Sequence, residues 1–247
     1  MMELDTYPFL DREYFSTKIK DVAATYNQAD PFPHVVIDDF LPEDIAQKIA
    51  DSFPKPNLTS FEQPDNAFQK NKLGRTQAND FLGVPNYIRH FLTDMNNMVM
   101  VDWLEAVTSI QGIIPDPHFQ GGALHQILPG GKLAIHADFN MHPKLKLDRR
   151  LNVLIYFNRS WEESYGGHLE LWDKDMTTCK SRILPIFNRC VIFNTTSTSY
   201  HGHPNPLTCP PDRTRNSIAL YYYTNGRPDD EKNAKHSTLW QERPDGP

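Results

Sequence analysis

The spacing of hydrophobic positions along the chain changes near residue 120. Before that point, apolar residues between Tyr87 and Ile110 recur every three or four positions, which predicts an amphipathic helix packed on a core. Upstream, segment 31–53 predicts a strand, a turn and a helix. The polar, proline-containing segment 54–82 predicts a long loop of the kind that forms lids or binding loops.

Beyond residue 120, short apolar runs alternate with turns such as Pro129-Gly130-Gly131 and Gly166-Gly167. The runs cover residues 123–128, 132–136, 151–157, 168–172, 189–193 and 217–223. Many short strands at this spacing are typical of a double-sheet barrel. We therefore predict a mainly β fold with flanking helices (α+β), in which a double-stranded β-helix (jelly-roll, cupin-like) core is braced by N-terminal helices.

The length of 247 residues fits a single domain. The expected order within 1–247 is helical support and a first strand over 1–119, including the loop 54–82. A jelly-roll catalytic core follows over 120–225, and a C-terminal tail over 226–247.

Charge and cysteine content narrow the function classes. The net charge is −6 and no basic cluster occurs, so we expect no nucleic-acid partner. Three cysteines are too few for a disulfide framework, the first residues are acidic where a secretory signal is basic, and no apolar run is long enough to span a membrane. We expect a soluble, cytoplasmic protein without a membrane partner.

A histidine and a carboxylate lie two positions apart at His136 and Asp138, after the strand-like run 132–135. Alternation along a strand points both side chains to the same face. A third ligand must come from a distant strand, and His201 is our choice. Two histidines and one carboxylate bind one face of a ferrous ion and leave the other open to a chelating cosubstrate and dioxygen. His203 shares the parity of His201 and either orients a ligand or substrate or is an ordinary turn histidine.

Such an oxygenase also needs a cation for the far carboxylate of 2-oxoglutarate. A guanidinium suits this task because it grips a carboxylate through two parallel hydrogen bonds. Arg215 opens the strand-like run 216–223, and Arg213, on the same parity, is its competitor.

Several segments, in their order, resemble the prolyl-hydroxylase-like branch of the Fe(II)/2-oxoglutarate-dependent dioxygenases. They are HADFN, LNVLIYFN, SYGGHLELW, the histidine in SYHGHPNP and the arginine in RTRNSIALYYY. The resemblance covers residues 120–225, and the segment PFPHVVIDDFLPEDIAQKIADSFP is similar to the opening of bacterial members.

The resemblance implies cofactors and roles. The expected cofactors are Fe(II) and 2-oxoglutarate as cosubstrate, with ascorbate as a reductant. The implied iron ligands, which are also the catalytic residues, are His136, Asp138 and His201. Arg215 is expected to pair with the distal carboxylate of the cosubstrate, assisted by the hydroxyl of Tyr156. By strand parity, Asn152 and Leu154 face the same cavity as Tyr156.

The chain departs from the family at Leu128, where the animal oxygen-sensing prolyl hydroxylases have a tyrosine. One cosubstrate hydrogen bond is then either missing or supplied by His125 or Gln126. The insertion 139–150 is expected to line the substrate entrance. At its end, Arg149 or Arg150 either meets a carboxylate or carbonyl of the substrate or is an ordinary ion-paired arginine.

The expected function is that of a 2-oxoglutarate/Fe(II)-dependent oxygenase, prolyl 4-hydroxylase-like, which consumes O2 and hydroxylates an aliphatic C–H bond. The related halogenating enzymes have a non-ligating residue in place of Asp138, so the carboxylate favours hydroxylation. The first hypothesis for the substrate is a prolyl residue of a peptide or protein, and the alternative is a free amino acid or small metabolite. A non-catalytic jelly-roll binding module and a zinc hydrolase remain rival classes.

Overall fold

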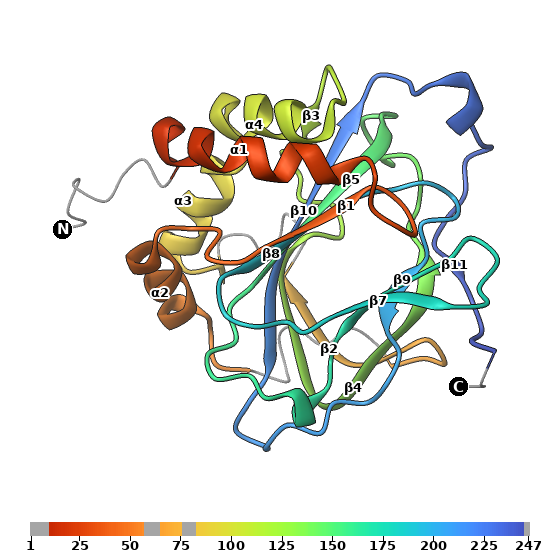
Figure 1. Ribbon diagram of the computed structural model, residues 1–247. Helices are drawn as coiled ribbons and strands as arrows, with labels where there is room; N and C mark the ends of the chain where they lie inside the picture. The colour runs from red at the N-terminus through yellow and green to blue at the C-terminus, as the bar shows by residue number, and fades with distance from the viewer. Residues whose placement is uncertain (1–9, 57–64, 76–82, 245–247) are drawn as a thin grey trace.

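The computed structural model describes residues 10–56, 65–75 and 83–244 (Figure 1). Its helices are α1 (Arg12–Tyr26), α2 (Glu43–Ser52), α3 (Asn86–Asp94) and α4 (Met98–Thr108), with short 3-10 helices at Glu163–Tyr165 and Asp229–Glu231. Its strands are β1 (His34–Ile37), β2 (Gln69–Arg75), β3 (Ile114–Pro115), β4 (Ala123–Ala137), β5 (Asp148–Tyr156), β6 (Leu169–Trp172), β7 (Cys179–Ile183), β8 (Arg189–Asn194), β9 (His201–His203), β10 (Arg215–Thr224) and β11 (Leu239–Trp240).

The strands form one antiparallel sheet in the order β1-β8-β5-β10-β4-β9-β6-β7, to which β2 and β11 add on β4 and β3 adds on β10. The long strand β4 joins two halves of this sheet. Residues 123–127 of β4 pair with β10, whereas residues 133–136 pair with β9. The residues Pro129-Gly130-Gly131 lie between these two stretches of β4, and the sheet as a whole forms a half barrel. The predicted jelly-roll core is confirmed.

The N-terminal helices brace the half of the sheet that contains β5, β8 and β10, as predicted. Figure 1 shows α1, α3 and α4 together on one side of the barrel. Three aromatic rings meet edge to face there, with ring centroids 5.3 to 5.9 Å apart. They belong to Phe15 of α1, to Trp103 of α4 and to Phe40, which lies between β1 and α2. The Trp103 indole also donates a hydrogen bond of 2.9 Å to the carbonyl of Phe15. These rings belong to one apolar cluster with side chains of the three strands.

The prediction of a single helix between Tyr87 and Ile110 is wrong in one respect, because the segment forms two helices, α3 and α4. The side chain of Asn97 accepts hydrogen bonds from the backbone amides of Val99 and Met100 and so starts α4 anew. The apolar periodicity continues across the break because both helices bury residues in the same core.

The prediction of a loop over 54–82 is also corrected, because β2 lies within it and pairs with β4. The remaining parts 57–64 and 76–82 lie outside the described residues. The sequence of β2, QKNKLGR, has no apolar alternation, so only pairing with β4 reveals it as a strand. No helix of the described residues has the length and apolar character needed to cross a membrane.

Candidate active site

Three potential metal ligands meet inside the half barrel. His136 lies near the end of β4, Asp138 follows that strand directly, and His201 begins β9. Their ligand atoms all lie within 4.8 Å of one another. Nε2 of His136 is 3.7 Å from Oδ1 of Asp138, and Nε2 of His201 is 3.4 Å from Oδ2 of the same carboxylate. All three side chains can therefore reach one ion.

Both imidazole rings are oriented by backbone carbonyls. Nδ1 of His136 lies 2.8 Å from the carbonyl oxygen of Ala134, and Nδ1 of His201 lies 2.9 Å from that of Ser199. Because a carbonyl only accepts, each Nδ1 carries the proton and each Nε2 presents a lone pair toward Asp138. Burial lowers the pKa of both rings, to about 3 for His136, so both are neutral at pH 7. Neutral imidazoles held by a second hydrogen bond suit Fe(II).

Gly202 lets β9 approach β4 closely enough for this geometry. His201 pairs with His136 in the ladder between the two strands, and their ring centroids are 4.6 Å apart. A Cβ on Gly202 would lie 2.9 Å from the carbonyl oxygen of Leu133 and 2.7 Å from that of Ala134. Backbone atoms of a sheet cannot move aside, so a side chain at this position would push the two histidines apart.

Arg149 and Asn152 of β5 bind the carboxylate of Asp138. Its Oδ2 accepts a hydrogen bond of 2.7 Å from the amide nitrogen of Asn152 and lies 3.0 Å from Nη2 of Arg149. The amide oxygen of Asn152 accepts from Nε and Nη2 of Arg149 at 3.1 and 2.7 Å. The three side chains thus form a closed triangle that fixes the orientation of the carboxylate.

The charge of Asp138 survives its burial because of its neighbours. Desolvation alone would raise the pKa of the carboxyl, but Arg149, His201 and His136 together hold that pKa well below its ordinary value. Burial would likewise lower the pKa of Arg149, whereas Asp138 raises it. The carboxylate and the guanidinium are therefore both ionised at neutral pH.

The guanidinium of Arg149 packs against two rings that are nearly perpendicular to each other, and it is almost completely buried, with 1% of the residue exposed. Its central carbon lies 3.5 Å from the ring centroid of Tyr221 and 4.5 Å from that of Phe139. Among the described residues, its Nη1 has no hydrogen-bond partner. The Nη1 group of Arg149 therefore donates no hydrogen bond to the described parts of the protein.

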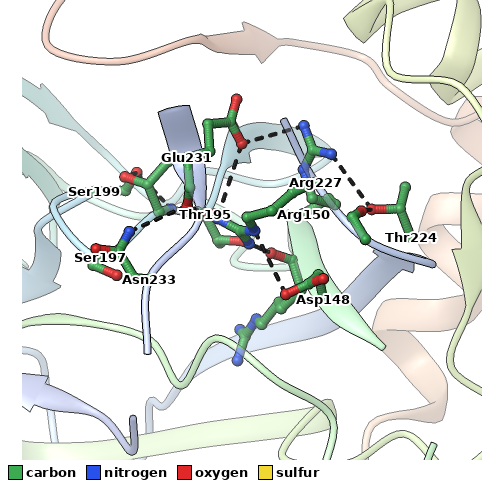
Figure 2. A network of polar contacts seen from close by, with 12 residues as sticks. Asp148, Arg150, Thr195, Ser197, Ser199, Thr224, Arg227, Glu231 and Asn233 are labelled. Atoms are coloured by element: carbon green, nitrogen blue, oxygen red, sulfur yellow. Dashed lines mark hydrogen bonds and ion pairs between the residues drawn. The ribbon is translucent and has the colours of Figure 1, made fainter. Parts of the chain in front are cut away.

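A polar network that includes Asp148, Thr195, Arg227 and Glu231 lies at the start of β5 (Figure 2). The hydroxyl of Thr195 donates to the carbonyl of Arg149 at 3.0 Å, and the guanidinium of Arg227 donates to the same oxygen. Arg227 lies 3.7 Å from Asp148 and 3.9 Å from Glu231. The network ties the segment after β10 to the strand that carries the triangle.

Arg215 and Tyr156 lie together at the far end of the same cavity. Nη2 of Arg215 donates to the Tyr156 hydroxyl at 3.3 Å, and Nε donates to the carbonyl of Gly167 at 2.8 Å. Gly167 has a φ of 73°, and a Cβ there would lie 2.9 Å from Cδ of Arg215 and 2.6 Å from Leu207. The Gly166-Gly167 pair therefore provides a turn and the space that Arg215 needs.

A cavity of about 240 Å³ connects the two ends. It is lined by all six residues that the sequence analysis assigned to the site, namely His136, Asp138, Asn152, Tyr156, His201 and Arg215. Leu154 lines it as well, as strand parity predicts. Asn152 differs from the other two residues expected at the cosubstrate, because it bonds to Asp138 instead of lying beside Arg215.

The alternatives left open by the sequence lie in distinct places. Arg213 does not line this cavity, because β10 begins only at Arg215 and strand parity does not extend to it. Its guanidinium instead donates to the carbonyl of Arg159 at 2.8 Å. Gln126 bonds to the carbonyl of Pro54 and to Asn216, away from the cavity.

The structure also locates His125, His203 and Arg150, whose roles the sequence left open. His125 and His203 both line the cavity, and His203 is 4% exposed with no hydrogen-bond partner for either ring nitrogen among the described residues. His203 is therefore not a plain turn residue. Arg150 lies 3.4 Å from Glu231 and outside the cavity lining, whereas Arg149, which is also ion-paired, lines the cavity.

Two cavity residues, Lys72 and Trp240, were missed by the sequence analysis. The ring centroid of Trp240 is 5.0 Å from that of His136, and its other neighbour, Phe68, stacks on it at 4.8 Å. Lys72 lies on the polar strand β2 and Trp240 on the two-residue strand β11, and both strands add on β4. Neither segment has a hydrophobic period, so no signal in the sequence could have found them.

Comparison with known proteins agrees with this geometry. Residues 122–223 match the family described as the 2OG-Fe(II) oxygenase superfamily. This stretch contains β4 to β9 and most of β10, and therefore the three potential ligands and Arg215. No curated protein matches the chain by sequence.

Solved structures share the fold at low sequence identity. A prolyl hydroxylase from Trichoplax adhaerens, in complex with a peptide fragment of the hypoxia inducible factor oxygen degradation domain, is 17% identical over 85% of this chain and 91% of that chain, with a TM-score of 0.60. A prolyl-4-hydroxylase from Pseudomonas putida is 15% identical over 83% and 100%, with a TM-score of 0.53. HygX from Streptomyces hygroscopicus, with nickel, 2-oxoglutarate and hygromycin B bound, is 12% identical over 93% and 97%, with a TM-score of 0.51.

At these identities the structural similarity shows the fold alone. The family match adds the chemistry, and the convergence of two neutral imidazoles and a carboxylate agrees with it. Residues 122–223, which contain the three potential ligands and Arg215, are thus an oxygenase segment of the 2OG-Fe(II) oxygenase superfamily type, whose cofactors are Fe(II) and 2-oxoglutarate.

Proposed function

We propose that this enzyme is a hydroxylase that inserts one oxygen atom of O2 into an aliphatic C–H bond of its substrate. The observation that carries the proposal is the convergence of His136, Asp138 and His201 on one point beside a cavity. When bound, Fe(II) and 2-oxoglutarate supply the oxidation, in which the cosubstrate and O2 yield succinate, carbon dioxide and the hydroxylated product. The protein contributes position, charge and exclusion of water.

In this proposal His136, Asp138 and His201 hold the iron from one side. Arg149 and Asn152 keep the carboxylate ionised and oriented, so that it ligates the metal and leaves no room for another anion. Arg215 and Tyr156 pair with the distal carboxylate of 2-oxoglutarate, because both direct polar groups into the end of the cavity away from Asp138. Ascorbate is proposed as a reductant that returns the iron to the ferrous state.

We propose a prolyl residue of a peptide or protein as the substrate. Tyr221, Phe139 and Trp240 line the cavity, and a pyrrolidine ring can pack against the aromatic surface that Arg149 leaves uncovered. Nη1 of Arg149 is available to a carbonyl or carboxylate of the substrate. Two of the structures with this fold are prolyl hydroxylases, which agrees with the proposal.

Hydroxylation of a free amino acid or small metabolite is the second candidate. The cavity of about 240 Å³ is small, which favours a compact substrate. HygX, with the same fold, has hygromycin B bound.

The organisation and location of the chain are also proposals. We propose that residues 1–247 act as one oxygenase domain, because side chains of the N-terminal helices and of β5, β8 and β10 share one apolar cluster. A cytoplasmic location is supported by the free state of Cys179, Cys190 and Cys209.

The test is O2-dependent formation of succinate from 2-oxoglutarate in the presence of Fe(II). We expect turnover with the wild type and none with His136→Ala. A screen of proline-containing peptides and free amino acids for a mass gain of about 16 Da, one oxygen atom, then identifies the substrate class. Absence of succinate under every condition would contradict the oxygenase. Turnover with an amino acid but with no peptide would replace the prolyl hypothesis by the second candidate.

A further inference from the structure

The far end of the cavity contains a second cation besides Arg215. Lys72 of β2 lines this cavity. Among the described residues, no acceptor lies within hydrogen-bonding or ion-pairing distance of its amine. Asp138 is the only carboxylate that the described residues contribute to the lining, and it is already paired with Arg149 at 3.0 Å. No ion pair therefore joins the amine to a carboxylate in these parts of the protein, although the charge of Asp138 acts on it from a longer distance.

Strand register places Lys72 level with Arg215. Lys72 pairs with Ile127 between β2 and β4, and Arg215 pairs with the same Ile127 between β4 and β10. Residues directly opposite each other in neighbouring strands point to the same face of a sheet. Two spacings between strands put the Cα atoms of Lys72 and Arg215 about 10 Å apart, so the two long side chains can close on one carboxylate between them.

Two histidines lie near the two cations, and the described residues place no unpaired carboxylate in the cavity lining. His203 lies close to both cations, because after desolvation by burial the charges of Arg215 and Lys72 are the next causes that lower its pKa. Burial, and after it the charge of Lys72, lowers the pKa of His125 in the same way. This end of the cavity is therefore suited to an anion and poorly suited to any neutral or positive group.

We infer that Lys72 binds the distal carboxylate of 2-oxoglutarate together with Arg215 and Tyr156. The inference rests on the proposed function, to which it adds a cosubstrate-binding residue. Leu128 offers no hydroxyl, and Gln126 is turned away from the cavity. Lys72 of β2 therefore supplies a polar partner for the distal carboxylate that Leu128 and Gln126 do not provide.

The position of Lys72 along the strands favours the cosubstrate over the substrate. Arg215 begins β10, and Tyr221, against which Arg149 lies, is six residues further on, about 20 Å along the strand. Arg149 and Asp138 mark the end where we place the substrate. A contact with a carboxylate of the substrate is thus the competing outcome of the test.

The test compares two ligands on three variants by calorimetric titration of the Mn(II)-loaded protein. One ligand is 2-oxoglutarate, and the other is 2-oxopentanoate, which keeps the chelating end but lacks the distal carboxylate. Lys72→Met is expected to weaken 2-oxoglutarate binding about tenfold and to leave 2-oxopentanoate binding unchanged. Lys72→Arg keeps most of the affinity. Lys70→Met is the matched control, because Lys70 is an exposed lysine of the same strand.

Two results would overturn the inference alone. Equal 2-oxoglutarate affinity in wild type and Lys72→Met would assign the amine to the substrate or to solvent. An equal loss for both ligands would also contradict it, because a contact with the distal carboxylate cannot affect an acid that lacks this group. If the wild type binds neither acid, the proposed function fails as well, so the two failures are distinguishable.

A pH series on the wild type gives a second readout, for which Lys72→Arg is the reference. Burial lowers the pKa of Lys72 to about 8, with Asp138 raising it and Arg215 lowering it. The amine is charged below that pH, so wild-type affinity for 2-oxoglutarate should fall between pH 7 and 9, and that of Lys72→Arg should stay constant. The facing groups do not titrate in this window, because Asp138 is ionised, His125 and His203 are neutral and Arg215 stays charged. A wild-type profile as flat as that of Lys72→Arg would contradict the inference.

Discussion

Arg149 and Asp138 form a buried ion pair in which Nη2 of the arginine lies 3.0 Å from Oδ2 of the carboxylate. The same guanidinium rests on the ring of Tyr221, and the same oxygen accepts a hydrogen bond from Asn152. Because both charges are removed from water, each depends on the other for its stability. An arginine that touches no proposed metal position therefore controls the charge of a proposed iron ligand.

Replacement of Arg149 by methionine should weaken metal binding most at low pH. Without the guanidinium, desolvation raises the pKa of Asp138 with less opposition, so the carboxylate becomes protonated at a higher pH than in the wild type. We expect Co(II) affinity at pH 6 to fall about 10- to 100-fold, and the loss to shrink as the pH rises. Titration calorimetry from pH 5.5 to 8 measures both effects.

The matched control for this prediction is Arg150→Met. Arg150 is also a buried arginine of β5, but it pairs with Glu231 and does not line the cavity. Its loss should leave the pH dependence of Co(II) affinity unchanged. Equal effects of the two substitutions would show that Arg149 acts only through stability of the fold.

Arg215 and Arg213 provide a pair of variants on one short segment. Arg215→Met removes the cation paired with Tyr156 and should raise the KM for 2-oxoglutarate at least about 30-fold, with a smaller effect on kcat at saturation. Arg213→Met should change neither constant, because Arg213 donates to the Arg159 carbonyl outside the cavity. Succinate formation at varied 2-oxoglutarate gives both constants. An increase in KM for Arg213→Met that matched that of Arg215→Met would contradict the assignment.

The buried histidines should make the metal-free protein sensitive to acid. Burial lowers the pKa values of His125, His136, His201 and His203 in the folded state. Below about pH 6.5 the unfolded chain binds protons that the folded chain refuses, so the free energy of unfolding falls as the pH decreases. Each such proton contributes about 1.4 kcal/mol per pH unit.

Urea unfolding of the metal-free protein at pH 7, 6 and 5 measures this slope. His203→Phe should reduce the slope by up to one proton, because it removes a buried ring that lines the cavity without a hydrogen-bond partner among the described residues. His90→Ala should not change it, because His90 is exposed on α3. A free energy of unfolding that stayed constant from pH 7 to 5 would mean that the histidines are protonated in the fold.

The sequence could predict the parts of the fold that have a hydrophobic period. The runs 151–157 and 189–193 alternate or are wholly apolar because β5 and β8 are buried, and both were found as strands. The strand β9 has only three residues, which is too short to show a hydrophobic alternation. The strand β2 is polar and has no such alternation. Their existence depends on pairing with β4, which is contact between segments distant in sequence.

The same limit applies to the site. His136 and Asp138 can be recognised because they lie two positions apart and so point to the same face of a strand. Arg215 can be recognised because it opens an apolar strand. The burial of Arg149 against Asp138 could not be predicted, since its neighbours in sequence, Asp148 and Arg150, suggest a solvated surface. Lys72 and Trp240 come to the cavity from edge strands that no pattern marks.

The account depends on a single metal site built from His136, Asp138 and His201. The most direct measurement is anaerobic titration of the metal-free protein with Fe(II), for the wild type, His201→Ala and the exposed control His90→Ala. We predict one equivalent bound by the wild type and by His90→Ala, and an affinity at least about a hundredfold lower for His201→Ala with an unchanged circular dichroism spectrum. Fe(II) binding by His201→Ala as tight as that of the wild type would contradict the account.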